Sequence, residues 1–297
     1  MPTFRTIRDR RPARGAAAEP DGSRTTSEFD RSWWSWAGPH GGLLAALTLD
    51  AAGDVVAADR VPQTVSTQFF TPAGEGEIVL DARVLRAGGS SDVVRVDVFS
   101  GETAVLTSTV TLARPRSGGT TYDAVPAPAA PPPDECPVVS PPVELVPFAQ
   151  HVEIRAASPG PLQGGDRAEL VAWIRWADAG APVDRAALVV FLDALAPALY
   201  GIATVPVPVP TVDFTATLGG AAPSGKPTAE NPRAGDPPSG DGSGEGGQRW
   251  LLVRIATRSA ADGWCVDDSD VWSGGGTLLG QARQTRRVLG DVRGGTG

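Results

Sequence analysis

The stretch Asp97-Val98-Phe99-Ser100-Gly101 recurs late in the chain as Asp270-Val271-Trp272-Ser273-Gly274. The match extends without a gap over residues 92–113 and 265–286, at an offset of 173 residues. A second match relates residues 64–70 to residues 213–219 at an offset of 149. An internal repeat of this kind is typical of two copies of one folding unit. The sequence therefore predicts two α+β units joined in one chain.

The two copies differ in the polar residues that they carry at matched places. The first copy has Thr64 and Thr111 where the second has Asp213 and Gln284. The offsets differ because residues 219–249, rich in Gly and Pro, interrupt the second copy. We therefore expect the first unit to serve structure and the second unit to carry the chemistry.

Each copy shows a helical pattern followed by strand patterns. In the first, Gly41-Gly42 opens an apolar stretch with helical spacing from residue 43 to 51, and Asp184 is a suitable N-cap for a helix from about Arg185 to Leu199 in the second. Alternating apolar residues predict strands at 64–70, 77–86, 92–100, 104–113, 171–176, 209–218, 250–258, 265–273 and 277–288. The expected unit is a long helix wrapped by a curved antiparallel sheet.

Three segments lie outside this pattern. Residues 1–28 lack periodicity and are interpreted as a disordered tail, and residues 115–148 form a Pro-rich linker. Residues 219–249 are interpreted as an inserted excursion. The predicted units therefore span residues 29–114 and 149–290.

Composition restricts the function classes. The 297 residues carry a net charge of -8, which argues against nucleic acid or an anionic membrane surface as the main partner. Cys136 and Cys265 stand in unrelated contexts, so neither a disulfide framework nor a metal site is expected. No signal peptide or apolar run of membrane-spanning length is present, and a cytoplasmic location is the expectation.

Three segments resemble the double-hotdog acyl-CoA thioesterases, of the acyl-CoA thioesterase II type. They are the helix entry Gly38-Pro39-His40-Gly41-Gly42, the strand Val209-Pro210-Thr211-Val212-Asp213-Phe214 and the strand Gly280-Gln281-Ala282-Arg283-Gln284. The resemblance covers about residues 30–114 and 150–289. It implies an α+β double hotdog whose two units form one long sheet.

The resemblance also implies a reaction and its residues. In that family an Asp, a Thr or Ser and a Gln hold a water that hydrolyses the thioester of an acyl-CoA, without metal or cofactor. Matched to this sequence, they are Asp213, Thr257 (with Ser259 as a further option) and Gln284. His40, Gly41 and Gly42 are the candidate substrate-binding residues at the helix start.

Each of these residues also has a plain structural interpretation. Asp213 and Gln284 could lie on solvated strand faces, Thr is common in strands, and His40 could cap a helix. The cluster Arg283, Arg286 and Arg287 could meet the phosphates of coenzyme A or cover a strand face. A non-catalytic acyl-binding or assembly protein is the alternative function, and a hotdog hydratase ranks third. The sequence does not determine whether the protein forms a homodimer, which acyl chain it takes, or whether the acyl carrier is coenzyme A or a carrier protein.

Overall fold

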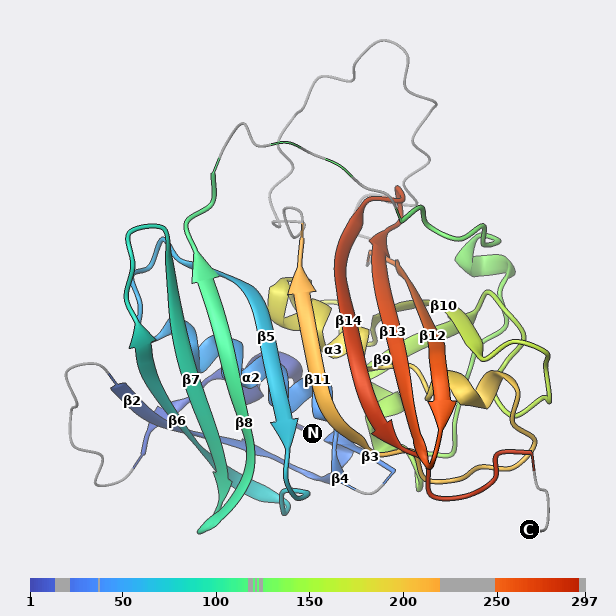
Figure 1. The fold of residues 1–297 in the computed structure, drawn as a ribbon, viewed down its shortest axis with the longest axis horizontal. Coiled ribbons are helices and arrows are strands. Elements are labelled where there is room, and N and C mark those ends of the chain that lie inside the picture. Colours follow the sequence, from blue (N-terminus) through green and yellow to red (C-terminus); the bar gives the residue numbers. More distant parts are fainter. Residues whose placement is uncertain are drawn as a thin grey trace.

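The computed structural model describes residues 1–13, 22–36, 38–116, 120, 122, 125–219 and 249–293. One antiparallel sheet of twelve strands dominates it, in the order β1-β2-β6-β7-β8-β5-β11-β14-β13-β12-β10-β9 (Figure 1). The strands are β1 (Arg11–Pro12), β2 (Gly22–Phe29), β5 (Val61–Phe69), β6 (Gly76–Arg86), β7 (Ser91–Ser100), β8 (Thr103–Ala113), β9 (Val152–Ala156), β10 (Glu169–Trp176), β11 (Thr211–Leu218), β12 (Leu251–Ala261), β13 (Trp264–Ser273) and β14 (Leu278–Arg287). The short strands β3 (Trp34–Ser35) and β4 (Gly38–Pro39) pair separately. The expected α+β architecture with a large antiparallel sheet is confirmed.

Helices α2 (Gly41–Gly53) and α3 (Arg185–Leu192) lie against one face of this sheet, behind the strands in Figure 1. Nearly all of their side chains are buried, because each helix packs against the sheet and against the other helix. Gly42 makes the helix contact close: a Cβ atom there would lie 3.0 Å from the carbonyl oxygen of Val189. The seam between the two helices is therefore built on a residue without a side chain.

The two halves of the sheet meet at β5 and β11, side by side in the centre of Figure 1. Their register pairs Ser66 with Thr215, two residues that lie 149 positions apart, and their hydroxyl groups hydrogen-bond at 3.0 Å. Outward from this seam, β8, β7 and β6 follow β5 in the same order in which β14, β13 and β12 follow β11. The offset of 149 found in the sequence therefore relates strands that face each other at the centre of the sheet.

The strand register in the second half corrects one of the residue matches between the two copies. Val94 and Asp267 keep the offset of 173, but Val94 pairs with Val110 while Asp267 pairs with Gln284. The place of Gln284 in the first half is thus taken by Val110, and the match with Thr111 was wrong by one residue. The cause is the turn before β14: five residues lie between the paired Trp272 and Leu278, whereas four lie between the equivalent pair Phe99 and Ala104.

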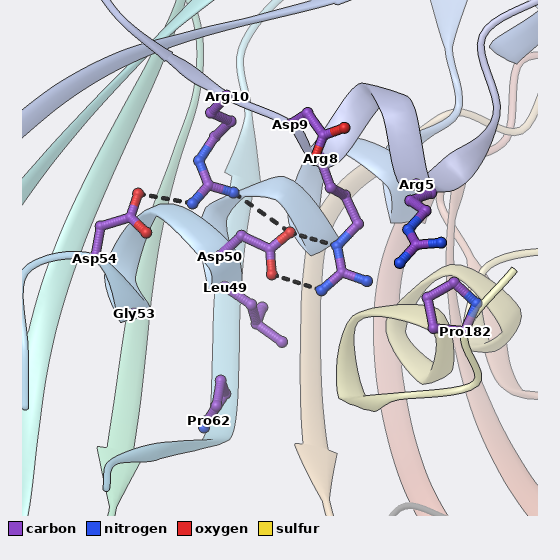
Figure 2. Close-up of a pocket in the computed structure, with 10 residues that line it drawn as sticks. All are labelled: Arg5, Arg8, Asp9, Arg10, Leu49, Asp50, Gly53, Asp54, Pro62 and Pro182. Atoms are coloured by element: carbon purple, nitrogen blue, oxygen red, sulfur yellow. Dashed lines mark hydrogen bonds and ion pairs between the residues drawn. The ribbon is translucent and has the colours of Figure 1, made fainter. Parts of the chain in front are cut away.

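The amino-terminal segment is ordered where it is described, so the prediction of a disordered tail was wrong there. Helix α1 (Phe4–Arg8) buries Phe4 and Ile7, and β2 joins the sheet. Arg8 donates to both carboxylate oxygens of Asp50, at 2.6 and 2.8 Å, and Arg10 donates to Asp54 at 2.7 Å (Figure 2). Apolar burial and ion pairs to the carboxyl-terminal end of α2 hold the segment, two features that a scan for periodicity does not weigh.

Two further expectations need correction. The second helix ends at Leu192 instead of Leu199, and a short 3-10 helix at Ala198–Gly201 follows Pro197. Within the expected linker, the carbonyl group of Val125 accepts from the indole of Trp272, so this stretch packs on the outer face of the sheet. The predicted insertion lies almost entirely outside the described residues, which omit 220–248. No described helix is long and apolar enough to cross a membrane.

Candidate active site

Asp193 stands directly after the last residue of α3, where the chain leaves the helix. Its amide group still bonds to the carbonyl oxygen of Val190, but its φ and ψ of -112° and 5° are no longer helical. The side chain, 11% exposed, points across the helix seam towards the beginning of α2. There its Oδ2 accepts a hydrogen bond of 2.7 Å from the amide group of Gly42. A carboxylate at this place is stabilised by the positive end of the α2 dipole.

His40 fixes the same corner from the α2 side. Its Nδ1 accepts from the amide group of Leu43 at 3.1 Å and so caps the helix. Its Nε2 therefore carries the proton and donates to the main-chain oxygen of Asp193 at 3.1 Å. Burial lowers the pKa of His40, although Asp193 acts in the opposite direction, so the ring is neutral. His40 thus ties the end of α3 to the start of α2.

Gln284 reaches this carboxylate from the sheet. It is fully buried on the inner face of β14, and its Nε2 donates to Oδ1 of Asp193 at 2.8 Å. Because a carboxylate only accepts hydrogen bonds, this contact turns the amide oxygen away from Asp193. That oxygen, Oε1, is buried and has no hydrogen-bond partner among the described residues. The pair thus presents a carboxylate beside an unpaired amide acceptor.

Arg286, two residues further along the same face of β14, connects this pair to a second carboxylate. Its Nη2 lies 3.6 Å from Oδ1 of Asp193, and its Nε lies 3.1 Å from Oδ2 of Asp267. Asp267 is completely buried, and its Oδ1 accepts from the hydroxyl group of Thr257 at 2.7 Å. A chain of polar contacts therefore runs from β12 through β13 and β14 to the end of α3.

The residues predicted from the sequence are only partly brought together. Gln284, His40 and Gly42 all meet at Asp193, and Gly41 adjoins it, since a Cβ atom on Gly41 would lie 3.1 Å from its Oδ2. Thr257 is two strands away from Gln284 across the sheet, about 10 Å given the usual strand spacing, and bonds to Asp267 instead. Ser259 is exposed beyond a bulge that follows Thr257.

Asp213 is on the opposite face of the sheet. Its neighbour Phe214 is buried in the core and pairs with Gln284, whereas Asp213 pairs with Thr285 and with the exposed Gln68. Successive side chains of a strand point to opposite faces, so the Asp213 carboxylate and the Gln284 amide are separated by the sheet. Partial burial raises the pKa of Asp213, and its carboxylate bonds to no other described residue.

The arginine cluster also divides between the faces. Arg286 is buried on the inner face, while the exposed Arg283 pairs with Asp268 and Arg287 lies over the ring of Trp264. The residues missed by the sequence analysis are Asp193 and Asp267. Asp193 interrupts the apolar run from Ala186 to Leu195, and the alternation of β13 places Asp267 on the same face as Cys265 and Val271.

Two family models match the chain. The model of the acyl-CoA thioesterase N-terminal domain covers residues 30–113, and the model of the acyl-CoA thioesterase C-terminal domain covers residues 124–288. The chain belongs to the acyl-CoA thioesterase family. The chain carries Asp193, Thr257, Asp267, Gln284 and Arg286 within the range of the C-terminal domain, and His40 and Gly42 within that of the N-terminal domain.

Solved structures with the same fold include a hot dog fold protein of Alicyclobacillus acidocaldarius, which is 23% identical with a TM-score of 0.78 over 97% of this chain and 98% of that one. The TesB protein of Mycobacterium avium is 16% identical, with a TM-score of 0.71 and coverage of 97% and 98%. The acyl-CoA thioesterase II TesB2 of Mycobacterium marinum is 19% identical, with a TM-score of 0.66 and coverage of 97% and 99%. The chain therefore has the hotdog fold. No curated protein matches its sequence.

Proposed function

We propose that this chain hydrolyses acyl-CoA thioesters to a free acid and coenzyme A, with a water held by Asp193 and Gln284. The observation that carries the proposal is the pairing of a nearly buried carboxylate with an amide whose oxygen is a buried acceptor without a donor. A water between them satisfies both groups, because it donates one proton to Asp193 and the other to Gln284 Oε1.

The chemistry follows from this placement. As the water oxygen bonds to the thioester carbonyl carbon, its proton passes to the Asp193 carboxylate. The bond between carbon and sulfur then breaks, and the proton passes from Asp193 to the leaving thiolate. One water is consumed, and the products are a carboxylic acid and the thiol of coenzyme A. The amino-terminal turn of α2, which already directs the Gly42 amide at Asp193, supplies a positive dipole for the negative charge that develops.

The proposal gives Asp193 the role that the sequence had suggested for Asp213. Gln284 keeps its expected role, and His40, Gly41 and Gly42 build the corner at which the acyl-CoA thioester is bound. Thr257 acts on Asp267 rather than on the water. The proposal includes the finer interpretation of the fold, in which each half of the sheet with its helix is one hotdog unit. The shared strand order and the offset of 149 at the central seam support it.

The test is release of free thiol from a panel of acyl-CoAs from acetyl to palmitoyl, by the wild-type protein and by Asp193→Asn. Release that the variant lacks would support hydrolysis at this site and would give the preferred chain length. Equal release by both proteins would refute the role of Asp193. Binding of acyl-CoA without hydrolysis by the wild-type protein would favour the non-catalytic alternative.

A further inference from the structure

The chain Thr257–Asp267–Arg286 is more polar than a core of this kind requires. Asp267 is completely buried, and only 7% of the Arg286 side chain is exposed. Burying such a pair costs desolvation energy that its own attraction only roughly offsets, and apolar residues at the same places often serve stability as well or better. The corresponding residues in the first half of the sheet are Val94 and Leu112, which are apolar and fully buried.

The contacts of Thr257, Asp267 and Arg286 lead from β12 towards Asp193. Asp267 is held from two sides, by the hydroxyl group of Thr257 at 2.7 Å and by the amide group of Ala198 at 3.4 Å. It forms an ion pair with Nε of Arg286 at 3.1 Å, without the alignment of a hydrogen bond, and the carbonyl oxygen of Val209 accepts from Nη1 at 3.4 Å. The third nitrogen, Nη2, makes no hydrogen bond to a described residue and lies 3.6 Å from the Asp193 carboxylate.

We infer that Arg286, held by Asp267 and Thr257, is a positioning residue that fixes the orientation of the Asp193 carboxylate for thioester hydrolysis. This inference rests on the proposed function. The charged or titratable groups that face Asp193 among the described residues are the neutral His40 from the start of α2 and Arg286 from β14, with Asp267 of β13 behind it. Arg286 is thus the cation that faces the carboxylate, at a distance where attraction is strong in a buried site.

Asp267 has the opposite effect on the same charge balance. Two carboxylates flank one guanidinium, so this part of the site carries one net negative charge when Asp193 and Asp267 are both ionised. Without Arg286, the carboxylates of Asp193 and Asp267 would share the region without a cation between them to hold their positions. Asp267 therefore serves to lock the guanidinium in place, not to take part in the reaction.

The experiment compares Arg286→Gln with the double variant Arg286→Gln/Asp267→Asn, in thioester hydrolysis and in thermal unfolding. The single variant leaves Asp267 buried without its cation and is expected to lose both stability and turnover. The double variant removes both charges and keeps similar side-chain shapes, so its stability should recover. If Arg286 positions Asp193, kcat of the double variant stays reduced by about 100-fold with KM nearly unchanged, as expected for a misplaced catalytic group.

A merely structural Arg286 predicts another result. Its only role would then be to neutralise Asp267, and the double variant would regain turnover together with stability, which would overturn the inference. Arg286→Lys is the conservative variant: it keeps the charge and should retain more turnover than Arg286→Gln. Wild-type protein that hydrolyses no acyl-CoA would instead refute the proposed function, and the role given to Arg286 with it.

Discussion

Equivalent residues form a row on the inner face of each half of the sheet, but the side chains of the two rows differ in polarity. The row crosses three strands in each half and follows the same register, with a bulge after its first residue in both. In the first half the row is apolar and consists of Val84, Val94, Val110 and Leu112. In the second half it is polar and consists of Thr257, Asp267, Gln284 and Arg286. The first half thus forms the same helix and sheet without these polar groups. Burying them in the second half costs desolvation energy, which indicates that they are kept for a function.

The largest effect on this comparison should come from giving the second half the residue of the first. Gln284→Val introduces the side chain found at Val110 and removes the amide that holds the water. We expect kcat to fall by about 100-fold, because one orienting hydrogen-bond group is lost. The free energy of unfolding should fall by only about 1 kcal/mol, since one hydrogen bond to Asp193 is lost and an aliphatic side chain replaces the amide. Thiol release and denaturant unfolding measure the two quantities, and a variant that keeps full activity would contradict the account.

The ion pair of Asp267 and Arg286 can also be replaced by the residues of the first half. Asp267→Val/Arg286→Leu installs the residues of the first half, and its free energy of unfolding should stay within about 1 kcal/mol of wild type. The single variant Asp267→Val serves as the control, and it should lose about 3 kcal/mol because it deprives a buried guanidinium of its anchor. Denaturant unfolding of the wild type, the single variant and the double variant measures these free energies. Equal losses in the single and the double variant would show that the pair itself stabilises the fold.

The reverse exchange tests the first half. Val110→Gln places an amide on the inner face of β8, where the register partners Val65 and Val94 offer no side-chain hydrogen bond. The free energy of unfolding should fall by about 1–3 kcal/mol, the usual cost of burying an unsatisfied polar group. Val110→Ala is the control for the lost aliphatic contacts. A Gln variant as stable as the wild type would mean that the first half tolerates the polar row too.

The smallest effect concerns His151, which is stacked on Trp33 and lies 2.9 Å from the hydroxyl group of Ser32. Burial lowers the pKa of His151 to about 4, although the charge of Asp30 acts in the opposite direction. The unfolded chain therefore binds a proton below about pH 6.5 that the native protein binds only near pH 4. Stability is lost as pH falls through this window, by about 1–2 kcal/mol after allowance for screening by solvent. In His151→Gln this part of the pH dependence should vanish, as unfolding measured at pH 7 and pH 4.5 would show.

The sequence reveals the sheet well because its strands alternate and because the two copies can be aligned. The strands on both sides of the seam lie within a few residues of their expected ends, and Asp184 caps α3 as expected, with its side chain 3.0 Å from the amide group of Ala187. The amino-terminal segment was missed because two arginines and two apolar side chains show no period, yet they find partners far along the chain.

The site was harder to predict because it joins elements that are distant in the sequence. Gln284 was found through the resemblance of its strand to the thioesterase family, although the sequence match set it opposite Thr111 and the register sets it opposite Val110. Asp213 was assigned by its strand, but the strand's alternation places it on the outer face. Asp193 ends an apolar helix, and its role becomes visible only when the start of α2 and the inner face of β14 are placed beside it.

The two aspartates therefore give the most direct test of the claim that the inner face of the second half is the active site. Asp193→Asn and Asp213→Asn change one carboxylate oxygen each and should fold alike, so kcat/KM for the preferred acyl-CoA can be compared directly. We expect Asp193→Asn to lose about 1000-fold in kcat/KM, a loss at the scale of general base catalysis, and Asp213→Asn to retain the wild-type value. Loss of activity in Asp213→Asn with Asp193→Asn fully active would contradict the account and move the site to the outer face of the sheet.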